Sequence, residues 1–178
     1  MNGSIAEDNG MAKVAILKIP DDIPTLTAVG RIALRHNQLD RLIRLTLKHS
    51  GQEGYTDTTT GKMRVSFSKS LKALKKLVKE KATTEQPLNE LRALLDRAKK
   101  VTTTRNDFLH SLWAEHDGKM IMDGDEGAGP APSVAKLTQF YGELTGIVME
   151  LNESRLRGDL TRITGRPIKK RREKAPED

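Results

Sequence analysis

The sequence contains no cysteine, few aromatic side chains and no long apolar run. The absence of cysteine excludes a disulfide framework and every cysteine-ligated zinc site. No segment approaches the length of a membrane span, and the opening MNGSIAEDNG lacks the basic and apolar regions of a signal peptide. We therefore expect a cytoplasmic protein that has no membrane segment.

The 178 residues are 36% hydrophobic and 31% charged, which is typical of one soluble domain with polar ends. Their net charge of +7 lies mostly near the C-terminus, since residues 155–178 contain nine basic and four acidic residues and leave only +2 for residues 1–154. We predict three parts: a disordered or extended arm (1–21), a helical domain (22–157) and a disordered basic tail (158–178).

The densest basic run of the tail is KKRREK, residues 169–174. Its first four residues are candidate contacts to RNA phosphates: Lys169, Lys170, Arg171 and Arg172. No aromatic residue is interleaved with them, so the run offers charge without a surface for base stacking. A solvated basic end is an equally good interpretation.

Apolar residues recur at spacings of three and four in four segments, which predicts helices over 22–49, 66–82, 87–113 and 133–153. Residues 12–20 are predicted to be a short strand or an extended arm. Glycine and small polar residues predict loops over 50–62 and 115–132, with 119–122 briefly extended. The expected fold is all-α, an antiparallel four-helix bundle with a long loop before the last helix.

Two polar features of these helices have structural explanations. The lysines of the second helix lie mostly opposite its apolar face, and a basic face of this kind is usually solvated. His36 falls on the apolar face of the first helix, where a histidine is usually hydrogen-bonded in the core. That helix would nevertheless bring His36 or Arg35 near the end of the third helix.

The third helix carries two sets of aligned residues. One begins at Leu88 and continues through Arg105, and the other contains Lys99, Thr103, Asn106, His110 and Trp113. A bundle helix usually needs one such face, so the second indicates a cleft or a partner surface. Arg105 and His110 are about 140° apart around a straight helix and about 7.5 Å along it. In a straight helix we therefore expect them not to face each other within one chain. To act on one phosphate, either the helix bends near the threonines or the two long side chains converge on a groove made with another subunit.

RNDFLH, residues 105–110, matches the R-x4-H motif of the HEPN superfamily, whose nucleases carry a small polar residue after the arginine, as Asn106 does here. The helices VGRIALRHNQLDRLI and KLTQFYGELTGIVMELN on either side are also similar to bacterial HEPN-like proteins. The resemblance covers about residues 22–155. It implies a HEPN-like bundle and a homodimer in which two motifs face each other across a cleft.

The resemblance further implies a metal-independent endoribonuclease that leaves a 2′,3′-cyclic phosphate and needs no cofactor. Arg105, His110 and Asn106 are then the catalytic residues, and Trp113 is a candidate for substrate binding. Histidine exchanges protons near neutral pH, and the guanidinium offers a fixed set of donors to a charged transition state. Such enzymes occur in toxin–antitoxin and defence systems, where an antitoxin or regulatory protein is the partner.

Each of these residues also has a structural explanation. Arg105 could cover apolar surface and pair with Asp107 or Asp96, and His110 would be favoured at a helix end by the macrodipole. Trp113 could be a core or interface anchor. The alternative function is therefore a non-catalytic HEPN-like helical module that binds a protein or a nucleotide.

Overall fold

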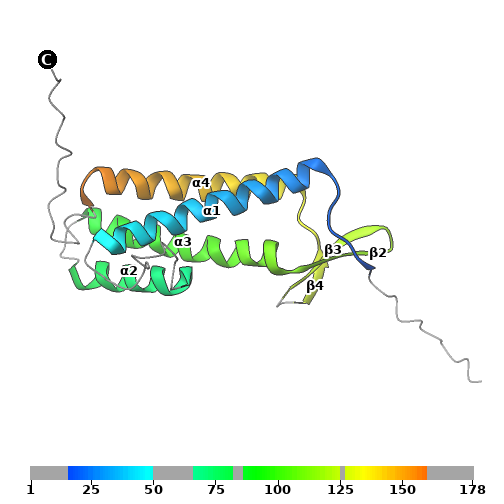
Figure 1. Ribbon diagram of the computed structural model, residues 1–178, viewed down its shortest axis with the longest axis horizontal. Coiled ribbons are helices and arrows are strands. Elements are labelled where there is room, and N and C mark those ends of the chain that lie inside the picture. The colour runs from blue at the N-terminus through cyan, green and yellow to red at the C-terminus, as the bar shows by residue number, and fades with distance from the viewer. Residues whose placement is uncertain (1–15, 50–65, 82–85, 125–126, 160–178) are drawn as a thin grey trace, which may run out of the picture.

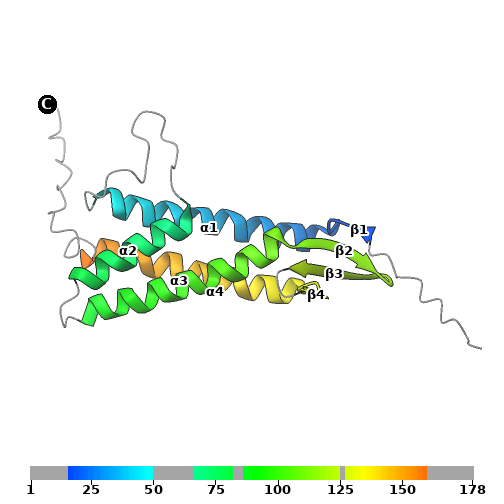
Figure 2. The ribbon, with the colours of Figure 1, turned by 90° about the horizontal axis from the view of Figure 1, so that it is seen from below.

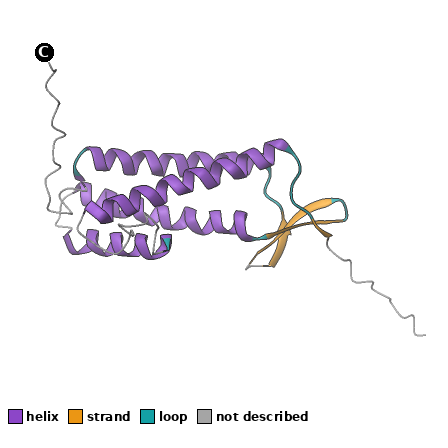
Figure 3. Cartoon of the chain, viewed as in Figure 1, coloured by secondary structure: helices purple, strands orange, loops and turns teal. Residues whose placement is uncertain are grey.

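The computed structural model describes residues 16–49, 66–81, 86–124 and 127–159. Four helices form an elongated bundle, and a small antiparallel sheet lies at one end of it (Figure 1, Figure 3). The helices are α1 (Ile23–His49), α2 (Phe67–Lys81), α3 (Gln86–His110) and α4 (Val134–Leu156). The strands are β1 (Ile16–Leu17), β2 (Leu112–His116), β3 (Lys119–Gly124) and β4 (Gly127–Pro130). None of the described helices combines the length and the hydropathy that crossing a membrane requires.

Three of the helices begin at a side chain that caps the first turn. Asp22 Oδ1 accepts the Thr25 amide at 2.8 Å, and Ser133 Oγ accepts the Lys136 amide at 3.2 Å. Ser66 Oγ accepts the amide three residues on in the same way, at 3.4 Å. Each cap satisfies one amide that the helix itself leaves without a partner. The predicted helix starts near residues 22, 66 and 133 are thus confirmed.

The apolar faces of the four helices meet in one core. The largest side chains that are fully buried come from α1, α2, α3 and α4: Ile32, Leu39, Ile43, Leu47, Leu74, Leu91, Leu95, Leu137, Leu144, Ile147 and Leu151. Burying each such side chain contributes about 1.5–3 kcal/mol. The predicted helical bundle and its apolar faces are therefore confirmed in their main features.

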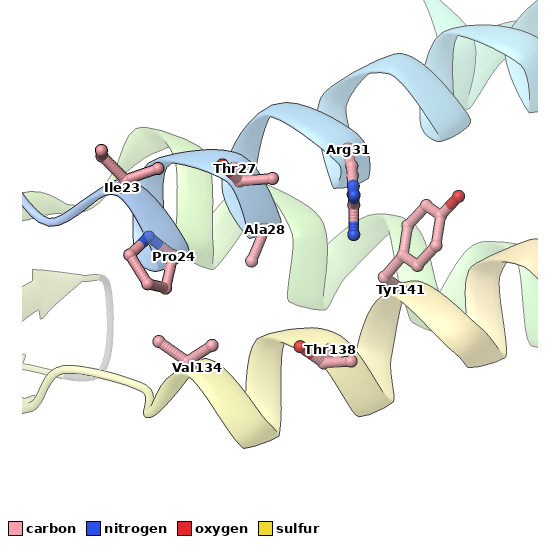
Figure 4. A pocket seen from close by; sticks show the side chains of 8 residues that line it. All are labelled: Ile23, Pro24, Thr27, Ala28, Arg31, Val134, Thr138 and Tyr141. Atoms are coloured by element: carbon pink, nitrogen blue, oxygen red, sulfur yellow. The ribbon is translucent and has the colours of Figure 1, made fainter.

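The helix directions differ from the predicted antiparallel arrangement, because α1 and α4 run the same way. A groove of about 250 Å³ between them is lined in matching order, with Ile23 and Pro24 near Val134 and with Arg31 near Tyr141 (Figure 4). Helix α3 runs in the opposite direction, since its Arg97 pairs with Glu150 of α4 at 2.7 Å while its later residue Phe108 packs against the earlier Phe140. It is also antiparallel to α2 (Figure 2). Only α3 therefore opposes the other three helices.

The predicted long loop before the last helix is instead a sheet, so the fold is not all-α. β2 pairs with β3 through a two-residue turn at Asp117 and Gly118, which both have positive φ angles of 50° and 71°. An Asp-Gly turn of this kind closes a tight hairpin. The prediction that 119–122 is extended is confirmed, whereas the prediction of a loop around it is wrong. Helix α3 also ends at His110, so Trp113 lies in β2.

The arm before α1 contributes β1 to the edge of the same sheet. Ile16 pairs with Glu115, and the amide of Lys18 donates to the carbonyl of Trp113 at 3.0 Å. The Lys18 ammonium also pairs with the Glu115 carboxylate at 2.6 Å. A two-residue strand is not stable alone, and here β2 supplies the partner that it needs.

Candidate functional site

The end of α3 brings together the three residues predicted to be catalytic. Arg105 Nη1 donates to Asn106 Oδ1 at 3.0 Å and lies 3.2 Å from His110 Nε2. Since a guanidinium only donates, His110 Nε2 is the acceptor, and the imidazole proton is then on Nδ1. Asn106 and His110 are exposed, whereas Arg105 is half-buried. One guanidinium nitrogen therefore links a proton-exchanging ring and an amide at the protein surface.

This contact overturns the expectation that Arg105 and His110 cannot meet within one chain. Helix α3 is α-helical from Gln86 to His110, so no break near the threonines is needed. The threonine hydroxyls donate to the carbonyls four residues earlier, as Thr102 does to Ala98 at 2.8 Å. The arginine side chain is long enough to follow the helix surface to its last residue. This contact therefore forms without the bend or the second subunit that we expected it to need.

A buried histidine lies beneath Arg105. His36 of α1 is only 6% exposed, its Nε2 is 3.2 Å from Thr102 Oγ1, and its ring packs against Phe67 with centroids 4.7 Å apart. Burial, together with the nearby Arg105 charge, lowers the pKa of His36 to about 4, against the opposing effect of Asp40. The predicted core histidine is thus confirmed, and it is neutral at physiological pH.

Arg105 itself is partly removed from water. Burial lowers the pKa of its guanidinium, although an arginine stays charged throughout the physiological range. Its Nε is buried and has no hydrogen-bond partner among the residues that the structure describes. A cation with an unused donor is costly to bury, so the site gains when an anion approaches.

The ion pairs offered as a structural explanation of Arg105 are not formed. Asp96 pairs with Lys75 of α2 instead. Within the described part of the chain, no ion pair joins Arg105 to Asp107. Among the described residues the guanidinium therefore forms hydrogen bonds to Asn106 and His110 but no ion pair, and its charge remains available to an anion.

Trp113 is attached to the end of α3 from the sheet. Its Nε1 donates to the Phe108 carbonyl at 3.2 Å, and the indole is half-buried. Phe108 packs edge-to-face against Phe140 of α4, with ring centroids 5.2 Å apart. The indole N–H is thus used within the protein, as the anchor interpretation expects, and any contact to a base would have to use the exposed part of the ring.

Arg35 lies at a different place. Its Nη2 donates to the Tyr141 hydroxyl at 3.1 Å, and its guanidinium carbon is 5.6 Å from the centre of that ring. The hydrogen bond from Arg35 lowers the pKa of Tyr141. The expectation that α1 brings Arg35 or His36 near the site thus holds for His36, whereas Arg35 contacts Tyr141 of α4.

The four basic tail residues predicted to bind substrate, Lys169 to Arg172, lie outside the described residues. Within the described ranges, no group of three or more His, Asp or Glu side chains is arranged to hold a metal ion. The pairing of His36 with Thr102 was not expected from the sequence. A polar residue on each of two apolar faces was the available signal.

Comparisons with protein-family models, curated proteins and solved structures found no match.

Proposed function

We propose that this protein is an endoribonuclease of HEPN type that acts as a homodimer and needs no metal ion. The observation that supports it most is the shared contact of Arg105 Nη1 with His110 Nε2 and Asn106 Oδ1. A base, a cation and an amide donor within one contact are the groups that phosphodiester cleavage by a neighbouring hydroxyl requires.

The proposed reaction begins when a phosphate of RNA binds at Arg105. The guanidinium transfers its hydrogen bonds to the non-bridging oxygens, which frees Nε2 of His110 to accept a proton. His110 then takes the proton of the 2′-hydroxyl, and the 2′-oxygen attacks phosphorus. The bond to the 5′-oxygen breaks, and that oxygen receives the proton from the His110 imidazolium, which returns the ring to its starting form. The products are a 2′,3′-cyclic phosphate and a 5′-hydroxyl, so DNA is not a substrate.

Arg105 stabilises the charge that develops on phosphorus oxygens during this reaction. Its surroundings favour this role, because no carboxylate among the described residues forms an ion pair with it. A preorganised donor of this kind contributes about 100- to 1,000-fold to the rate. Because His36 is neutral at physiological pH, it does not add a second positive charge next to Arg105.

The second candidate is a non-catalytic HEPN-like module that binds a protein or a nucleotide. One observation favours it: both Arg105 Nη1 and His110 Nε2 are occupied by each other, which is also what a structural contact requires. Either function is compatible with an antitoxin or regulatory partner that covers the same surface.

The proposal is tested with a mixed RNA pool incubated in EDTA with the purified protein. Arg105→Ala and His110→Ala are compared with Arg41→Ala and His116→Ala, which change the same residue types away from the end of α3. We expect cleavage by the wild-type protein and both controls, cyclic phosphate ends, no cutting of DNA, and a dimer by sedimentation. Equal cleavage by all five proteins would reveal a contaminant, and no cleavage by any of them would favour the binding module.

A further inference from the structure

We propose that α2 and the adjoining face of α3 form a phosphate-binding track that guides a single RNA strand to Arg105 and His110. This inference rests on the proposed function for the chemistry at its end, and on separate residues for the binding. The track consists of eight residues: Lys69, Lys72, Lys76, Lys79, Lys99, Thr103, Asn106 and His110.

The α2 part of the track is unusually basic. Helix α2 contains six lysines and one glutamate in 15 residues. Its four track lysines are exposed and spaced by three and four residues, so they share one face over about 15 Å. The opposite face is buried, with Leu71, Leu74, Leu77 and Val78 in the core. The exposed face therefore presents mainly ammonium groups, with the half-buried Ala73 at its edge.

The α3 part continues this surface to the candidate site. Helices α2 and α3 are antiparallel neighbours, with Lys75 paired to Asp96 and Arg92 Nη2 reaching the Lys79 carbonyl (Figure 2). Counting three residues along each helix from the Lys75–Asp96 pair puts Lys72 level with Lys99. The same face of α3 then carries Thr103, Asn106 and His110 at spacings of three and four. The track thus extends about 27 Å from the level of Lys79 to His110.

The acidic residues near the track leave its charge largely intact. Glu80 Oε1 lies 3.7 Å from Lys76 Nζ. Asp96 is paired with Lys75, which is not a member of the track. Asp107 is an exposed carboxylate beside Asn106. An excess of lysines therefore remains along the face, as counterion release from a polyanion requires.

A nucleic-acid strand fits this surface better than a membrane does. A helix that binds a bilayer buries its apolar face among the lipids, whereas the apolar face of α2 is already in the core. The track includes no Phe, Tyr or Trp side chain, so along most of its length it would contact the backbone and select little sequence. The end of the track at an arginine and a histidine is what a strand awaiting cleavage needs.

The test measures binding of fluorescent single-stranded DNA, which lacks the 2′-hydroxyl and is not cut. Lys69, Lys72 and Lys79 are changed together to Gln in the full chain. The matched control changes Lys48, Lys119 and Lys136, three exposed lysines on other elements, and removes the same charge. Both triple variants also carry Gln at Lys169, Lys170, Arg171 and Arg172, so that the tail does not mask the effect. Circular dichroism melting checks that both fold.

We expect the α2 variant to bind about tenfold more weakly than the control, with a salt dependence lower by about two counterions. RNA bound by the His110→Ala protein should show the same difference. Equal affinities of the two triple variants for the DNA would overturn the track. Binding to vesicles of anionic lipid is measured in parallel, and a difference between the variants that is seen only with vesicles would also overturn it. If the chain cuts no RNA but the difference persists, the nuclease fails and the track stands. If the wild-type protein cuts RNA and the two triple variants bind DNA equally well, the track fails and the nuclease stands.

Discussion

His36 Nε2 of α1 lies 3.2 Å from Thr102 Oγ1 of α3, one helical turn before Arg105. The Thr102 hydroxyl donates its own proton to the Ala98 carbonyl at 2.8 Å, so it can only accept from the imidazole. His36 therefore carries a proton on Nε2, and its pKa of about 4 keeps the ring neutral at physiological pH. This hydrogen bond joins two helices directly beneath the candidate site.

The first prediction concerns acid stability. His36 has a folded pKa of about 4, below its usual 6.5, so the unfolded chain binds more protons between these two values. Stability should therefore fall as the pH is lowered from about 6.5 to about 4, by up to about 3 kcal/mol from this residue. Urea unfolding at several pH values measures the change. His36→Gln keeps a donor for Thr102 and does not titrate, so its stability should fall less over this range, and parallel curves for the two proteins would contradict the assignment.

The second prediction concerns the shape of the Arg105 side chain. Arg105→Lys keeps the charge but removes the planar set of donors that contacts Asn106 and His110. We expect the single-turnover rate of RNA cleavage to fall about 100-fold or more. The affinity for single-stranded DNA should change less than threefold, because the charge is retained. A lysine variant that cuts at the wild-type rate would show that charge alone is sufficient.

The third prediction concerns the indole of Trp113. Trp113→Phe keeps an aromatic ring but removes the donor to the Phe108 carbonyl, which should lower the free energy of unfolding by about 1 kcal/mol. The end of α3 should fray. The Ser111 amide, which donates to the backbone carbonyl of Asp107, should therefore exchange its hydrogen faster with solvent. Tyr141→Phe loses a hydrogen bond to Arg35 and serves as the control. Unchanged exchange at Ser111 would mean that the indole does not hold the helix end.

The fourth prediction concerns the hairpin turn between β2 and β3. Gly118 has a φ of 71°, so Gly118→Ala should lower the free energy of unfolding by about 1 kcal/mol. Gly142→Ala tests the opposite sign, because Gly142 lies in α4 and a Cβ there would meet nothing within 4 Å. That change should stabilise the protein by about 0.5–1 kcal/mol. Thermal unfolding of both variants compares the two effects, and destabilisation by both would contradict the role of φ.

Much of the helical structure was predictable because its causes are local. Spacings of three and four residues identified the buried faces, and Asp22, Ser66 and Ser133 marked three starts. The sheet was missed because β2 follows α3 after a single residue, and Leu112 and Trp113 also fit the helical spacing. The Asp117-Gly118 pair was the available signal for a hairpin, and it was interpreted as part of a loop.

The sequence by itself determined which residues have the chemistry of the candidate site, and that Arg105, Asn106 and His110 lie near one helix end. Only the tertiary structure decided that α1 and α4 run the same way and that neutral His36 lies under Arg105. It also decided that Arg105 contacts His110 directly. Helix periodicity is set by backbone geometry within a few residues, whereas these contacts depend on how separate helices pack and how far one long side chain reaches.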